Sequence, residues 1–186
     1  MYWLIKGVSM EGFTMQLDGI DIVQKAQIFA IAAHAAVQQK RKYTGEPYIV
    51  HPAEVASIVA SVEGSTPDMV AAAWLHDVVE DTGVTLTDIH MNFGPEIAVL
   101  VSWLTDVSEQ HDGNRAKRKA IDREHTAQAP AEAQTIKLAD LISNSKSIMA
   151  HDPDFARVYL AEKKLLLEVL TKGDPGLHAE ASKYVL

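Results

Sequence analysis

A short polar run, His76-Asp-Val-Val-Glu-Asp81, holds one imidazole and three carboxylates within six positions and directly follows the apolar stretch 69–75. On a helix, His76 lies one turn from Glu80 and Asp77 lies one turn from Asp81, so the four polar groups are expected to converge. Carboxylates gathered beside an apolar face repel one another and are costly to desolvate unless a cation neutralises them. The run therefore predicts a divalent metal site with a general base beside it.

Two further segments carry residues that complete such a site. His51 lies at the predicted start of a helix, and Asp140 lies on an apolar helix with Asn144 one turn further along. Two imidazoles and two carboxylates suit manganese, iron or zinc better than calcium, and they leave positions open for water and phosphate oxygens. Glu80 and Asp81 then stand one turn beyond the metal, where they would orient and deprotonate the attacking water.

Each of these residues also has an ordinary structural explanation. A lone histidine-aspartate pair is common by chance, and His51 alone is most often a turn or cap residue. Asp140 with Asn144 would bond neighbouring helix ends, and Glu80 with Asp81 would form a solvated helix terminus. The order and spacing of all of them together favour the metal site over these explanations.

Composition and charge restrict the class of partner. The chain has 186 residues and a formal net charge of −8, which argues against broad binding to nucleic acid or anionic membranes, since both require basic surface. Basic residues gather at 40–42 and 115–119, which fits a small anionic substrate such as a nucleotide, although solvated helix ends explain either cluster alone equally well. The absence of cysteine predicts a reducing, cytoplasmic location, and nothing indicates an obligate protein partner.

Helical periodicity runs through almost the whole chain and predicts an all-α, single-domain helical bundle. Residues 1–18 are interpreted as an N-terminal extension and residues 19–186 as the domain. Thr66-Pro67 is the predicted start of the helix that carries the polar run, because threonine caps and proline suits the first turn. The other long helices are expected at residues 20–39, 52–62, 95–106, 115–127, 131–149 and 153–171, with a flexible loop at 108–114.

Two local patterns refine this prediction. Thr85 followed by Asp88 resembles a capping box and predicts a short helix after it. The inner stripe of the last long helix is expected to consist of apolar residues at helical spacing, namely Val158, Ala161, Leu165 and Val169.

Longer motifs around the candidate site resemble a known family. The order His51, His76-Asp77, Asp140 is the signature of HD-type metal-dependent phosphohydrolases. A narrower resemblance, to the hydrolase domain of Rel/SpoT-type alarmone enzymes, rests on Gly45-Glu-Pro-Tyr-Ile-Val-His-Pro52, Trp74-Leu-His-Asp-Val-Val-Glu-Asp-Thr82, Phe93-Gly94 and Lys137-Leu-Ala-Asp140 with Asn144. The resemblance covers about residues 20–170, so the chain looks like a stand-alone small alarmone hydrolase with an HD-type bundle.

This resemblance implies Mn²⁺-dependent removal of the 3′-diphosphate from (p)ppGpp, with release of pyrophosphate and GDP or GTP. Another divalent transition metal would also suit the ligand set. The resemblance assigns the metal to His51, His76, Asp77 and Asp140. It assigns activation of the water to Glu80 and Asp81. The substrate contacts that it implies are Asn144 at the ribose or the 3′ side, Arg41 and Lys42 at base and phosphate, and Arg115 and Arg157 at phosphate.

The chain departs from the family near the substrate and not at the metal. Tyr43 and Thr44 separate Lys42 from Gly45, where the family usually has one residue, and Leu141 follows Asp140, where the larger enzymes often carry a basic residue. An arginine stacked on a purine does not by itself distinguish guanine from adenine. Adenine alarmones such as ppApp therefore remain open as substrates.

Other functions stay open beside this one. A different HD-type nucleotide phosphohydrolase, such as a nucleotidase, would use the same metal ligands. A non-catalytic HD module that senses a nucleotide is an alternative from another class, although such modules typically lose ligands that this chain keeps. A purely structural bundle gives no reason for the clustered carboxylates.

Overall fold

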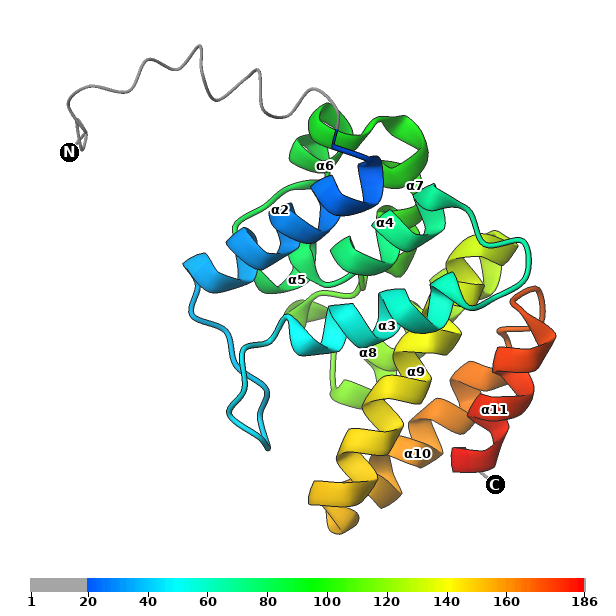
Figure 1. Cartoon of the computed structure of the whole chain (residues 1–186). Coiled ribbons are helices and arrows are strands. Elements are labelled where there is room, and N and C mark those ends of the chain that lie inside the picture. The colour runs from blue at the N-terminus through cyan, green and yellow to red at the C-terminus, as the bar shows by residue number, and fades with distance from the viewer. Residues whose placement is uncertain (1–19, 186) are drawn as a thin grey trace.

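The computed structural model describes residues 20–185, which form an all-helical bundle (Figure 1). Within that range the only strand-type pairing is an isolated bridge between Lys40 and Pro47. The all-α, single-domain prediction is therefore confirmed. The predicted extension at residues 1–18 lies outside the described residues. The helices are α2 (Ile22–Ala36), α3 (Val50–Ala60), α4 (Pro67–Leu75), α5 (Val78–Asp81), α6 (Leu86–Phe93), α7 (Pro95–Leu104), the 3₁₀ helix η1 (Gln110–Asp112), α8 (Arg115–Gln128), α9 (Ala131–His151), α10 (Pro153–Leu167) and α11 (Pro175–Val185).

The helix starts are set by local capping chemistry. Thr66 caps α4 by accepting a hydrogen bond from the Met69 backbone N–H, and Pro67 occupies the first turn. Thr85 and Asp88 form the predicted capping box of α6. These side chains satisfy backbone donors that a helix N-terminus leaves unpaired. The two predicted starts are confirmed because such bonds depend only on residues close in sequence.

Helix α9 occupies the centre of the bundle and is apolar on two faces. On one face Ile136 and Ala139 join the core built by α2, α3, α4 and α7. On the other face Leu138 and Leu141 pack with α10 and α11, and Figure 1 shows α9 between the two groups. A helix that is apolar on most of its circumference is buried. The polar residues of α9, Asp140 among them, are consequently held in the interior.

The inner stripe predicted for the last long helix is wrong within α10, whereas its last member, Val169, does pack against the core formed with α9 and α11. Val158 and Leu165 are 53% and 45% exposed, whereas Tyr159 and Leu166 of α10 are buried. The helix is rotated by about one residue from the predicted orientation because it packs on α9 and α11 together. The helix also ends at Leu167, and the expected loop at 108–114 contains the short helix η1.

The helix that carries the polar run is interrupted, which corrects the prediction of one continuous helix. Helix α4 ends at Leu75, a turn at His76 and Asp77 follows, and α5 covers only Val78–Asp81. Asp77 has φ −99° and ψ −4°, outside ordinary helical values, although the Asp81 N–H still donates to the Asp77 carbonyl. The turn changes the direction of the side chains at the centre of the candidate site.

None of the helices between residues 20 and 185 combines the length and apolar character that crossing a membrane requires.

Candidate metal centre and active site

Three ligand-type side chains meet where α3 faces the turn between α4 and α5. His51 comes from the first turn of α3, and His76 and Asp77 form the turn itself. One nitrogen or oxygen from each of the three lies within 4.8 Å of the others. The Nε2 atoms of His51 and His76 are 3.3 Å apart, and His76 Nε2 is 3.1 Å from Asp77 Oδ2. Donor atoms gathered at this spacing suit a single cation.

Asp140 of α9 is the fourth member of the cluster. Its Oδ1 lies 3.2 Å from His51 Nε2 and 3.8 Å from His76 Nε2, although it is not part of the tighter group of three. Asn144, one turn later on α9, donates from Nδ2 to the same Oδ1 at 2.6 Å. The structure therefore brings all four sequence-predicted ligands together, with Asn144 beside them.

Hydrogen bonds at the far nitrogens fix how the two imidazoles face the cluster. His51 Nδ1 is 2.9 Å from the Ser143 hydroxyl, which itself donates to Glu54 Oε2 at 2.7 Å. His76 Nδ1 is 2.8 Å from the carbonyl of Ala73. In both cases the partner oxygen accepts, so each Nδ1 carries a hydrogen and each Nε2 is the nitrogen left to bind a cation. This arrangement is typical of metal-binding histidines. Ser143 and Glu54 were not predicted from the sequence.

The cluster concentrates negative charge in the protein interior. His51 and His76 are about 1% exposed, and Asp140 is 7% exposed. Burial opposes ionisation of Asp77 and Asp140, yet the neighbouring histidines, and Lys137 beside Asp140, hold both carboxyl pKa values below their usual range. Burial would lower the pKa of His76, but the charge of Asp77 outweighs it and raises the pKa to about 9. A divalent cation would take the place of that proton and neutralise both carboxylates.

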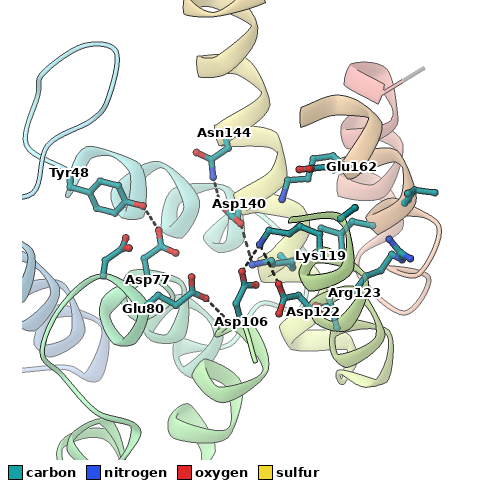
Figure 2. Close-up of a pocket in the computed structure, with 17 residues that line it drawn as sticks. Tyr48, Asp77, Glu80, Asp106, Lys119, Asp122, Arg123, Asp140, Asn144 and Glu162 are labelled. Atoms are coloured by element: carbon teal, nitrogen blue, oxygen red, sulfur yellow. Dashed lines mark hydrogen bonds and ion pairs between the residues drawn. The ribbon is translucent and has the colours of Figure 1, made fainter. Parts of the chain in front are cut away.

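Tyr48 is a further member of the site that the sequence reading left without a role. Its hydroxyl donates to Asp77 Oδ2 at 2.5 Å, and Figure 2 shows the phenol reaching the carboxylate from the segment before α3. Burial and the charge of Asp77 raise the tyrosine pKa, so the hydroxyl stays protonated. It therefore acts as a fixed donor that orients Asp77.

Glu80 and Asp81 stand beside the cluster but point to different partners. Glu80 Oε1 accepts a hydrogen bond from the Asp106 backbone N–H at 2.6 Å, and Asp81 Oδ2 accepts from Gln39 Nε2 at 2.9 Å. Burial raises the pKa of Glu80 to about 7, and the charge of Lys137 limits that rise. A carboxylate with a pKa near neutrality is suited to take a proton from water. Asp81 is held at the rim of the same cavity.

A cavity of about 340 Å³ opens from the cluster toward α8 and α10 (Figure 2). Asp77, Asp140 and Glu80 line one part of it, and basic side chains line another. The sequence reading did not predict the basic side chains as site residues, namely Lys119, Arg123, Lys137 and Lys163. They come from three helices, so no local spacing could have grouped them. Two of them had a sequence signal: Lys137 lies three positions before Asp140, and Lys119 belongs to the basic cluster at 115–119 that fits an anionic substrate.

The predicted substrate contacts divide into two groups. Asn144 lines the cavity, and Arg41 Nη1 lies 3.4 Å from Asn144 Oδ1. Arg41 itself does not line the cavity, and neither do the three other predicted contacts, which have acidic partners. Lys42 lies 3.7 Å from Asp152, Arg115 makes two 2.7 Å hydrogen bonds to Glu162, and the exposed Arg157 lies 3.8 Å from Asp154. The structure therefore brings Arg41 and Asn144 to the site and leaves the other three outside it.

The family of this chain follows from a match that spans most of its length. A family model of the HD domain matches residues 26–169, which contain all four residues of the histidine-aspartate cluster. The chain belongs to the HD domain family. This HD protein is 37% identical over 125 residues to the guanosine-3′,5′-bis(diphosphate) 3′-pyrophosphohydrolase MESH1 of Drosophila melanogaster, an alignment that covers 66% of this chain and 68% of that protein.

A second relative is much longer than this HD protein. It is the guanosine-3′,5′-bis(diphosphate) 3′-pyrophosphohydrolase of Aquifex aeolicus, 38% identical over 129 residues, which are 68% of this chain and 18% of that protein. The chain likewise spans 19% and 17% of the length of relatives from Synechocystis sp. and Mycobacterium leprae. It therefore matches less than a fifth of the length of these longer proteins.

A solved structure of a metazoan SpoT ortholog, described as hydrolysing ppGpp and acting in starvation responses, resembles this HD protein throughout. The TM-score is 0.78 with 26% sequence identity, and the match covers 90% of this chain and 98% of the other. The resemblance to the Rel/SpoT type expected from the motifs is thereby confirmed. In a member of this family, the histidine-aspartate cluster indicates a divalent metal ion.

Proposed function

We propose that this HD protein hydrolyses the 3′-diphosphate of purine alarmones, (p)ppGpp or (p)ppApp, and releases pyrophosphate and the nucleoside 5′-di- or triphosphate. The observation that carries the proposal is the histidine-aspartate cluster at one end of a cavity, with Glu80 beside it. Relatives named for this activity share about a third of their aligned residues with the chain.

We also propose the cytoplasm as its location, because the chain lacks cysteine.

We propose Mn²⁺ as the metal, held by His51, His76, Asp77 and Asp140. The support is the chemistry of the donors, since two imidazole nitrogens and two carboxylates suit a borderline transition ion better than Ca²⁺ or Mg²⁺. Both Nε2 lone pairs face the carboxylates because each Nδ1 is bonded elsewhere. The bound ion would polarise the phosphoryl oxygens and lower the pKa of the attacking water.

In this proposal Glu80 accepts a proton from the water that attacks the phosphorus next to the 3′ oxygen. The new bond joins the water oxygen to phosphorus, the bond from phosphorus to the 3′ oxygen breaks, and the 3′ oxygen takes up the proton that Glu80 removed from the water. The burial that raises the pKa of Glu80 to about 7 makes it a suitable base near neutral pH. Asp81, at the same rim, orients the water.

Arg41 and Asn144 are the substrate contacts that the geometry supports best. Asn144 lies between Asp140 and Arg41, so it can reach the ribose while the guanidinium reaches the base. Lys42, Arg115 and Arg157 stay predictions. Their present partners, Asp152, Glu162 and Asp154, would have to release them before they could bind a phosphate.

One experiment separates this function from its alternatives. Purified protein is incubated with ppGpp or ppApp, with Mn²⁺ or with a chelator, and pyrophosphate is measured over time. We expect Mn²⁺-dependent release from at least one of the two. Release of inorganic phosphate alone would favour another HD-type phosphohydrolase, and nucleotide binding without turnover would favour a sensing module.

The hydrogen bond between His51 Nδ1 and the Ser143 hydroxyl should contribute to metal affinity. Ser143→Ala removes the acceptor that holds Nδ1–H, so the imidazole loses its fixed orientation. We expect the affinity for Mn²⁺ to fall about 10- to 100-fold, the usual range for outer partners of metal ligands, with little change in fold. Calorimetric titration with Mn²⁺ measures this, and Ser147→Ala, one turn further along α9, is the matched control. Equal affinities in the two variants would contradict the role given to Ser143.

A further inference from the structure

One wall of the cavity is formed by lysines from three separate helices. Lys119 comes from α8, Lys137 from α9 and Lys163 from α10, and all three line the cavity that begins at the histidine-aspartate cluster. In Figure 2 Lys119 and Arg123 lie across the cavity from Asp77 and Glu80. This group, Lys119, Lys137 and Lys163, is called the lysine wall below.

Two members of the lysine wall already have acidic partners. Lys119 pairs with Asp106, and its Nζ lies 3.4 Å from Asp122. Lys137 Nζ lies 3.6 Å from Asp140 Oδ2. These contacts compensate most of the charge on the two ammonium groups. They also fix the two groups at the cavity surface, since Asp122 and Asp140 lie on the packed helices α8 and α9.

Lys163 differs from its neighbours in having no acidic partner. Among residues 20–185 it forms neither a hydrogen bond nor an ion pair, and its ammonium lies 5.1 Å from the centre of the Tyr159 ring. Burial, together with the charges of Lys137 and Lys119, lowers its pKa to about 8, although the charges of Asp140 and Asp106 oppose this shift. A partly buried ammonium beside two others, with no carboxylate in direct contact, is stabilised when an anion binds to it. Lys163 lines the cavity, so an anion that enters it can reach this ammonium group.

The lysine wall begins where the metal cluster ends. Lys137 contacts Asp140 directly, and Lys119 contacts Asp106, whose backbone N–H donates to Glu80. An anion bound to Lys137 would therefore lie next to Asp140 of the cluster. That arrangement fits two linked phosphoryl groups, with the first at the cluster and the second at the wall. A phosphate beyond the ribose would lie further away.

We infer that the lysine wall is a subsite for the terminal phosphoryl group of the 3′-diphosphate and for the pyrophosphate formed from it. Lys163, which has no acidic side chain in contact, is the member that binds the anion most directly. This inference rests on the proposed function, because it takes the scissile phosphorus to lie at the cluster. Charge-assisted hydrogen bonds from ammonium to phosphate oxygen, in a site partly shielded from water, supply the binding.

The test measures binding of inorganic pyrophosphate and, separately, GDP by calorimetry at a fixed concentration of Mn²⁺. It uses the full chain and the variants Lys163→Met, Lys163→Arg and Lys164→Met. We expect Lys163→Met to weaken pyrophosphate binding about tenfold or more and to leave GDP binding within about twofold. Lys163→Arg should retain most of the affinity. Lys164→Met, with the same charge change on the exposed neighbour, should behave as the wild type.

Three outcomes would overturn the subsite. Unchanged pyrophosphate binding in Lys163→Met would show that Lys163 contributes nothing, and an equal loss for GDP would make the wall a general anion surface. An equal loss in Lys164→Met would reduce the effect to net charge. The proposed function fails separately, if the wild type binds pyrophosphate through Lys163 yet cleaves neither ppGpp nor ppApp. Thermal unfolding of each variant confirms that the fold is retained.

Discussion

Asp77→Asn is expected to abolish Mn²⁺ binding and to lower pyrophosphate release at least about a thousandfold. Asp77 Oδ2 lies 3.1 Å from His76 Nε2 and 3.6 Å from His51 Nε2, so it is the carboxylate closest to both imidazoles together. An amide is neutral and a poor metal ligand. Loss of the ion removes several kcal/mol of transition-state stabilisation, and each 1.4 kcal/mol corresponds to about a factor of ten in rate.

The asparagine variant is chosen because it keeps the shape of the side chain. Its amide oxygen can still accept the hydrogen bond from the Tyr48 hydroxyl, so the surrounding packing is preserved. Metal content after dialysis, turnover of ppGpp and thermal unfolding measure the three effects separately. Asp154→Asn, on a carboxylate whose side chain is 95% exposed, is the control for the loss of one charge. Wild-type turnover in Asp77→Asn would refute the assignment of the metal centre.

Glu80→Gln is expected to lower the turnover rate about 10²- to 10⁴-fold while Mn²⁺ binding stays unchanged. The range is that of a lost general base. The glutamine oxygen can still accept from the Asp106 N–H, which keeps the loop after α7 in place. Steady-state kinetics with ppGpp and calorimetry with Mn²⁺ measure the two quantities. Glu63→Gln, on an exposed residue after α3, is the matched control.

The pH dependence of the wild type gives the same assignment an independent check. Glu80 accepts a proton only when it is ionised, so activity should rise with pH through its pKa, which burial raises to about 7. A bound divalent cation favours the ionised carboxylate and moves this rise to a lower pH. The test does not depend on the size of that displacement, because Glu80→Gln should lose the rising limb of the pH–activity curve altogether. Retention of that limb at an unchanged pH would assign it to another group.

The clustering of the histidines and aspartates could be predicted from the sequence because it depends on residue types and their order. His51, the pair His76-Asp77, and Asp140 each lie in or beside a segment whose helical period and caps are local properties. Metal chemistry restricts the donors to a few side chains, so four of them in apolar surroundings carry a strong signal. The helix starts at Thr66 and Thr85 were predictable for the same local reason.

Only the tertiary structure decided how these residues are held and what stands opposite them. The turn at His76 and Asp77, the bond from Ser143 to His51 and the rotation of α10 all depend on packing between helices distant in sequence. The lysine wall is the clearest case, since its members come from α8, α9 and α10. Periodicity describes which face of a helix is apolar. When a helix is apolar nearly all round, its neighbours decide which side faces the core. Charged residues that meet from different helices leave no pattern along the chain.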